Sequence, residues 1–196
     1  LLSGRLRDPQ VGGDLLVGVV AGILTSLLLA LGTLADPLAE TGGPRALNPQ
    51  LTTGAGTALS SWVGLLGSAL GGGLSQTFTL FLLWLLLKRR WLAVLSFIVI
   101  EFLISGAGAV APVGQALRVL AYGLWGYAVM RFGVVTAVTL VFTWIVLAHF
   151  PLTADLSAWY ATSALLTMAS VLALAIYGFR TTLAGRPLWR DELQEA

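Results

Sequence analysis

The feature that most constrains this chain is the length of its uncharged segments. Residues 15–34 form a run of 20 uncharged, mostly apolar residues, and no charge interrupts the chain from Gln50 to Leu87. A helix of about 20 apolar residues crosses the roughly 30 Å hydrocarbon core of a bilayer. A water-soluble domain of this size still leaves about 30% of its chain surface exposed, so it could not hide such segments. They predict helices that are surrounded by lipid.

The composition agrees with a membrane protein. Of 196 residues, 57% are hydrophobic and 10% are charged, whereas soluble domains carry about 25% charged residues. The net charge of +2 does not indicate nucleic acid binding, because the basic residues lie at the ends of apolar runs, where lipid headgroups are expected. The absence of cysteine excludes disulfides, thiolate metal sites and thiol catalysis. The predicted fold is an all-α, polytopic integral membrane helix bundle.

Charged and turn-forming residues divide the chain into six predicted transmembrane helices. The uncharged run at 50–87 is too long for one crossing at about 1.5 Å per residue, so we expect it to bend or break at Gly71, Gly72 and Gly73. The domain plan is a lead-in at 1–14, a transmembrane domain at 15–183 and a cytoplasmic tail at 184–196. The expected spans are residues 15–34, 74–87, 91–109, 112–130, 132–150 and 159–179.

Basic residues predict the orientation. With six spans, one side of the membrane holds nine basic residues. The other side holds one basic residue, Arg45, and the acidic residues Asp36, Glu40 and Asp155. Lys and Arg accumulate on the cytoplasmic side of membrane proteins, so both termini are expected in the cytoplasm. The nine residues are Arg5, Arg7, Lys88, Arg89, Arg90, Arg131, Arg180, Arg186 and Arg190.

Two charges fall inside predicted spans, where an ionisable side chain is costly. Glu101 lies ten residues after Trp91, and Arg118 lies six residues after Pro112. At 1.5 Å per residue, both reach similar depths on neighbouring helices, within about one turn. We therefore predict an intramembrane ion pair. A structural role is favoured over a proton or ion relay, because relays use further ionisable residues that these spans lack.

No catalytic or cofactor site is predicted as clearly as this ion pair. His149, the single histidine, is interpreted as an interfacial residue, with ligation of one pigment magnesium as the alternative; haem and zinc need partners that the sequence lacks. The chain has no G-x-S-x-G elbow and no P-loop. It is therefore not expected to be an enzyme or to hold a metal. Glycines four apart, at 18 and 22 and at 67 and 71, suit close helix packing within the chain or between copies.

Three segments resemble the C-terminal membrane region of large bacterial serine/threonine protein kinases. They are Leu2-Ser-Gly-Arg-Leu-Arg-Asp-Pro-Gln-Val-Gly-Gly-Asp-Leu-Leu16, Phe150-Pro-Leu-Thr-Ala-Asp-Leu-Ser-Ala-Trp-Tyr-Ala161 and Tyr177-Gly-Phe-Arg-Thr-Thr-Leu-Ala-Gly-Arg-Pro-Leu188. Gly13 departs from the pattern, which usually has Arg there. The resemblance implies a kinase domain ahead of this region and a location in the bacterial cytoplasmic membrane. It assigns no functional residues; Asp8 and Pro9 suit a turn before the first helix, and Asp155 and Ser157 suit a helix N-cap.

The leading functional hypothesis is a non-catalytic membrane domain that anchors a kinase-type signalling protein, with a role in its regulation left open. One alternative is an accessory subunit of a larger membrane complex, with lipid- or pigment-facing helices and His149 as its one candidate ligand. Another is a small transporter, supported by the glycine break and by Glu101 and Arg118. The expected partners are membrane lipids, and a homo-oligomer or a larger complex is left open. No cofactor is expected apart from lipid, with contact to a pigment or haem left open.

Overall fold

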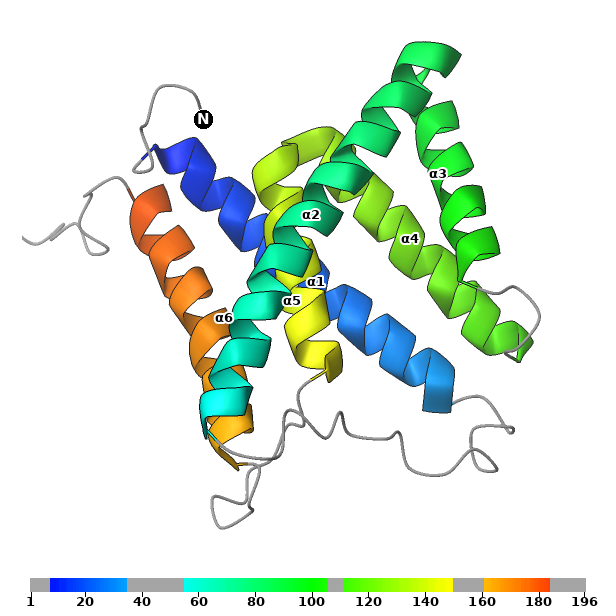
Figure 1. The fold of residues 1–196 in the computed structure, drawn as a ribbon. Coiled ribbons are helices and arrows are strands. Elements are labelled where there is room, and N and C mark those ends of the chain that lie inside the picture. The colour runs from blue at the N-terminus through cyan, green and yellow to red at the C-terminus, as the bar shows by residue number, and fades with distance from the viewer. Residues whose placement is uncertain (1–7, 35–54, 106–110, 150–160, 184–196) are drawn as a thin grey trace, which may run out of the picture.

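The computed structural model of the chain describes residues 8–34, 55–105, 111–149 and 161–183. These segments form six helices without a strand among them, which confirms the all-α fold class (Figure 1). The helices are α1 (Pro9–Leu34), α2 (Ala55–Leu87), α3 (Arg90–Ile104), α4 (Pro112–Phe132), α5 (Val134–His149) and α6 (Ala161–Thr182). The predicted N-cap at Asp155 and Ser157 lies outside the described residues.

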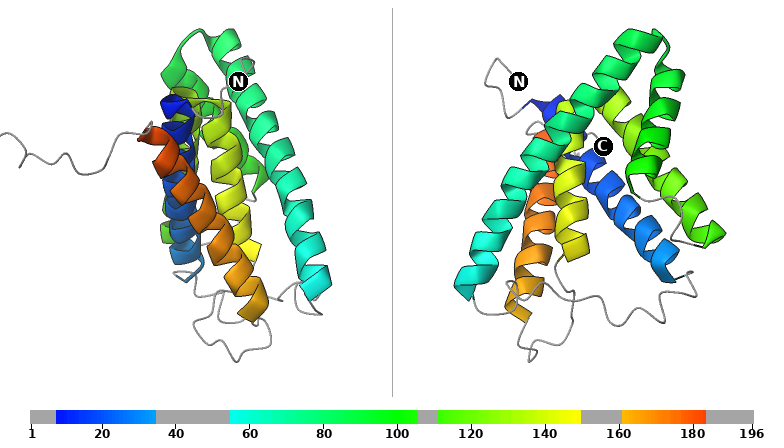
Figure 2. Two further views of the ribbon diagram at one scale, coloured as in Figure 1. Left: turned by 90° about the vertical axis from the view of Figure 1, so that its left-hand side faces the viewer. Right: turned by 45° about the vertical axis from the view of Figure 1, so that its right-hand side comes forward.

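Successive helices run in opposite directions. In Figure 1, α1, α3 and α5 run downward, whereas α2, α4 and α6 run upward, and the rotated views of Figure 2 agree. One end of the bundle therefore collects the start of α1, the α2–α3 turn, the α4–α5 turn and the end of α6. We call it the basic end, because its described residues include Lys88, Arg89, Arg90, Arg131 and Arg180.

Helix α1 is the central helix, because it packs against α4, α5 and α6. The Asp8 carboxylate accepts a hydrogen bond of 3.0 Å from the Gln10 backbone N–H, and Pro9 occupies the first helical position. This cap starts the helix at Pro9, six residues before the predicted span. Residues 9–14 were predicted to belong to a lead-in, because Asp14 precedes the uncharged run; Asp14 instead lies within α1, close to its beginning.

Glycines let α1 lie against α5 at close range. A Cβ atom on Gly18 would be 2.6 Å from the Thr139 Cβ, and one on Gly22 would be 2.6 Å from the Thr143 Cβ. The Thr136 hydroxyl of α5 also donates a hydrogen bond of 3.0 Å to the Asp14 backbone carbonyl. The Gly18–Gly22 pair therefore serves packing within the chain. Gly67 and Gly71 of the second pair have no described atom in the space of a Cβ.

The predicted break of the second helix is wrong. Helix α2 continues through Gly71, Gly72 and Gly73 as 33 helical residues. The reason is packing: a Cβ on Gly73 would be 2.7 Å from the Val138 Cα, so the glycine allows α2 to cross the backbone of α5. Contact with α5 offsets the low helix propensity of glycine, which is about 1 kcal/mol below that of Ala.

Short turns join α2 to α3 and α4 to α5. Gly133 alone separates α4 from α5, with φ of 88°, a conformation that side chains with a Cβ rarely adopt. Lys88 takes φ of 54° at the end of α2, and its N–H donates to the Trp84 carbonyl at 2.8 Å. Both turns reverse the chain within one or two residues, which fixes the neighbouring helices as antiparallel pairs.

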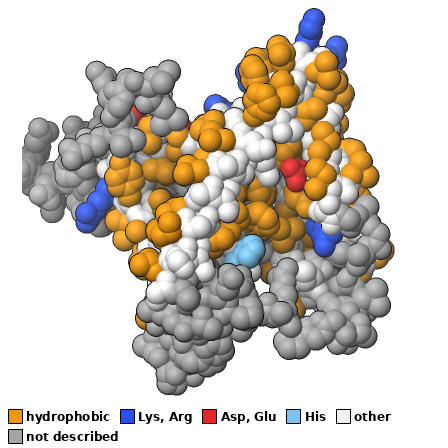
Figure 3. Space-filling model, viewed as in Figure 1, with side chains coloured by type: hydrophobic (Ala, Val, Ile, Leu, Met, Phe, Trp, Pro, Cys, Tyr) orange, Lys and Arg blue, Asp and Glu red, His pale blue; other side chains and the backbone are white. Residues whose placement is uncertain are grey.

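The interior of the bundle is mostly apolar, and much of its exterior is apolar too. Phe97, Leu140 and Trp125 are almost fully buried in the core shared by α2, α3, α4 and α5. Many large apolar side chains remain on the outside, and orange apolar surface covers much of the face in Figure 3, with Lys and Arg toward its edges. An exterior of this kind needs lipid or protein to cover it.

Three of the described helices are long and apolar enough to cross a membrane. They are Pro9–Leu34, Leu59–Leu87 and Ala164–Thr182. The other three depart from the predicted spans: α3 has 15 residues and α5 has 16, fewer than the roughly 20 of a perpendicular crossing. Helix α4 has 21 residues, but it carries Arg118 and Arg131.

Candidate functional site

One feature that could receive a ligand is an apolar cavity of about 520 Å³, which is lined by residues of α2, α5 and α6 together with Leu15 of α1. Its volume lies within the roughly 300–1,000 Å³ typical of small-molecule sites. We call it the α2–α6 cleft. Its walls come mainly from aliphatic and aromatic side chains, among them Leu66, Ala69 and Leu70 of α2, Phe142 of α5, and Ala173 and Leu174 of α6.

One hydrogen bond joins the two walls of the cleft. The Trp62 indole Nε1 donates to the Ser170 hydroxyl Oγ at 2.8 Å, and Ser170 in turn donates to the Leu166 carbonyl. The Trp62 ring also meets the Phe142 ring edge-on, with centroids 6.0 Å apart. Trp62 is half-buried and packs between helices.

The shape of the cleft follows from the directions of its walls. Helices α2 and α6 begin near each other at the end opposite the basic end, and they diverge toward the basic end (Figures 1 and 2). Helix α5 fills the space behind them and packs on α2. The Trp62–Ser170 bond lies on the narrow side, because both residues precede the other lining residues of their helices.

This arrangement suits a hydrocarbon ligand. The polar groups of the Trp62–Ser170 bridge are already engaged with each other and with the backbone. The remaining lining is apolar apart from Thr139, whose methyl group packs toward Gly18. Burial of apolar ligand surface against such walls contributes about 25 cal/mol per Å². The cleft offers no nucleophile with an adjacent base.

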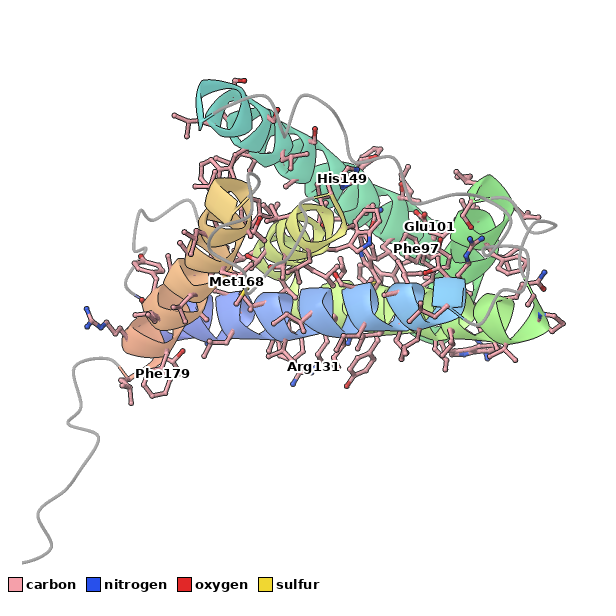
Figure 4. The ribbon with its side chains drawn as sticks, turned by 90° about the horizontal axis from the view of Figure 1, so that it is seen from below. Phe97, Glu101, Arg131, His149, Met168 and Phe179 are labelled. Atoms are coloured by element: carbon pink, nitrogen blue, oxygen red, sulfur yellow. The ribbon has the colours of Figure 1, made fainter. Side chains whose placement is uncertain are left out.

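Glu101 and Arg118 lie on helices that contact each other, α3 and α4. Glu101 follows the fully buried Phe97 by one turn, so both point from the same face of α3, and Figure 4 labels them side by side. Both charged residues are half-buried. No ion pair within 4.0 Å joins them in the described part of the chain, so their pairing in a membrane stays a prediction.

His149 ends α5 with an exposed ring. Its Nδ1 lies 2.9 Å from the Ile145 carbonyl oxygen of its own helix. Because a carbonyl only accepts, the proton belongs on Nδ1, which leaves Nε2 as the nitrogen able to bind a metal. Among the described residues, no group of three or more His, Asp or Glu could hold a metal ion. Contact with a pigment at His149 stays a hypothesis.

Sequence reasoning missed several polar groups inside the bundle. Four buried atoms have no hydrogen-bond partner among the described residues: Thr25 Oγ1, Thr143 Oγ1, Gln76 Oε1 and Trp125 Nε1. Their residue types are common in apolar helices, so only the packing reveals their burial. Ser170 was missed for the same reason, since one serine within a span gives no signal of its partner.

No protein-family model, curated protein or solved structure matches this chain. The resemblance to the membrane region of bacterial kinases therefore stays a prediction.

Proposed function

We propose that the chain is a six-pass, non-catalytic membrane domain that anchors a cytoplasmic protein. The observation that carries this proposal is the alternation of helix directions together with the basic end. Alternation brings the Lys88–Arg90 turn, Arg131 and Arg180 to one end although they are far apart in sequence. Lys and Arg on one side are what the positive-inside rule requires of cytoplasmic loops.

The short helices fit this proposal through their partners. Helix α3 packs against α2 and α4, and α5 packs against α1 and α2. A helix shorter than the hydrocarbon thickness can still cross, because local thinning of the bilayer and association with other helices accommodate it at a modest cost. The exposed apolar surface of α1, α2, α3 and α6 would then face the lipid.

The anchored protein would be a bacterial kinase-type signalling protein, which rests on the resemblance of residues 2–16, 150–161 and 177–188. Sequencing the gene upstream of the Leu1 codon tests this part. A reading frame with a kinase Gly-rich loop, H-R-D and D-F-G motifs supports it. An in-frame stop codon directly upstream contradicts it.

Anchoring itself is tested with a soluble reporter joined to the N-terminus of the full chain. The fusion should sediment with bacterial membranes and stay there through alkaline carbonate washing, whereas the reporter alone should stay soluble. Release of the fusion by carbonate contradicts membrane insertion.

An accessory subunit of a membrane complex is the second candidate. It is favoured by the face of α2 that carries Gly64, Gly67 and Gly71, where a Cβ would meet no described atom within 4 Å. Small residues on an unoccupied helix face allow another helix to approach closely. Co-purification of a stoichiometric partner in mild detergent would support this role over simple anchoring.

A further inference from the structure

We propose that the α2–α6 cleft holds one acyl chain of an anionic phospholipid, whose headgroup binds Arg180. This inference rests on the proposed membrane insertion. The proposed occupant is a phospholipid because the bilayer would surround the inserted chain, and because the charge of Arg180 and the depth of the cleft both fit one.

The depth of the cleft fits a hydrocarbon chain. Its α6 residues, Ser170 to Leu174, lie near the middle of a helix that spans Ala161–Thr182. On α2 the lining extends from Trp62 to Leu70, about 12 Å at 1.5 Å per residue. An elongated apolar slot at mid-depth adjoins the acyl region of a bilayer. Leaving it empty would forfeit the contacts of its walls.

The direction of the helices favours a lipid that enters from the basic side. Helices α2 and α6 diverge toward the basic end (Figure 1), so we place the entry of the acyl chain there and its tip near the Trp62–Ser170 bond. Arg180 follows Ala173 by seven residues, so it lies on the same face of α6, two turns or about 10 Å nearer the basic end. Its side chain is exposed. It can therefore meet a phosphate above the chain in the cleft.

Photo-crosslinking in reconstituted vesicles tests the proposal. The full chain is placed in phosphatidylcholine vesicles that contain trace phosphatidylglycerol or trace phosphatidylcholine, each with a diazirine midway along one acyl chain. Labelled residues are located by mass spectrometry. We expect labels to concentrate at residues 62–70 and 170–174, and to be stronger with phosphatidylglycerol.

Two variants test the binding of the acyl chain and the binding of the headgroup separately. Ala173→Phe should fill the slot and lower cleft labelling by both lipids roughly tenfold, the effect of about 1.4 kcal/mol. Its control is Ala169→Phe, one turn earlier and outside the lining. Arg180→Gln should remove the preference for phosphatidylglycerol, about fivefold for the loss of one Arg contact. Its control is Arg131→Gln, because Arg131 lies on the side of α1 opposite to α2, away from the cleft (Figure 4).

Even labelling of all exposed apolar helix faces would overturn the proposal. So would equal labelling by the two lipids in the unaltered chain, or the absence of label from the residues that line the cleft. Carbonate washing of the same vesicles distinguishes failure of membrane insertion from failure of lipid binding in the cleft. If the protein washes off, the proposed membrane domain is contradicted. If it stays but its cleft is not labelled, only the proposed lipid site is contradicted.

Discussion

A methyl group on Gly73 of α2 would lie 2.7 Å from the Cα atom of Val138 on α5. Real Cβ atoms do not approach backbone so closely, and backbone cannot rotate away as a side chain can. The contact explains why α2 stays helical through Gly73: the lack of a side chain at this position allows the two helices to cross.

Gly73→Ala should therefore destabilise the fold by about 1–3 kcal/mol, as overpacking of a core does. Gly71→Ala is the matched control, because it lies two residues away with no described atom near its Cβ position. It should be neutral or stabilise by up to about 1 kcal/mol through helix propensity. Unfolding titrations in mixed micelles measure both. Equal effects of the two substitutions would contradict the close α2–α5 crossing.

The contact between α1 and α5 is tested by a second pair of glycine variants. Gly18→Ala places a Cβ 2.6 Å from the Thr139 Cβ, whereas Gly13→Ala meets open space. We expect Gly18→Ala to cost about 1–3 kcal/mol and Gly13→Ala to cost nothing. Thermal unfolding in detergent, followed by circular dichroism, gives the comparison. A tolerated Gly18→Ala would show that these glycines serve another purpose, such as contact between copies.

The Trp62–Ser170 hydrogen bond is expected to contribute modestly. Ser170→Ala removes its acceptor and should lower stability by about 0.6 kcal/mol, the average for interhelical hydrogen bonds in a membrane protein. Trp62→Phe should cost a similar amount beyond the loss of ring area, and the double variant should show coupling. Strictly additive effects would mean that the two side chains do not bond in the membrane.

Helix positions could be predicted well from the sequence where local signals mark them. Pro112 begins α4 as expected, and Leu34 ends α1. The error in α2 has a physical cause. The break at Gly71 to Gly73 was predicted from helix propensity, but it is overruled by contact with Val138, which lies about 65 residues further along the chain and leaves no mark on the α2 sequence.

The candidate site was less predictable than the fold. The charges at Glu101 and Arg118 were visible because charges stand out in apolar segments. The α2–α6 cleft is formed by common apolar residues, and only the divergence of two helices turns them into a cavity. Trp62 and Ser170 meet across more than 100 residues of sequence, so no local pattern indicates their bond.

A double-mutant cycle tests the predicted pair of Glu101 and Arg118. Glu101→Gln keeps the shape of the side chain, and both Glu101→Gln and Arg118→Gln keep a hydrogen-bonding group, so their single effects should be mild. If the side chains pair in the membrane, we expect a coupling energy of at least about 0.5 kcal/mol in unfolding titrations. Additivity within about 0.3 kcal/mol would favour the alternative in which Arg118 extends toward the lipid headgroups.

The central claim, six passes with the basic end in the cytoplasm, can be tested with single cysteines because the chain has none of its own. Arg89→Cys, in the α2–α3 turn, should resist a membrane-impermeant thiol reagent in intact cells and react after permeabilisation. Ala111→Cys, at the start of α4, should react in intact cells; if α3 and α4 do not cross, it would stay unlabelled from outside. Labelling of Arg89→Cys in intact cells would contradict the account.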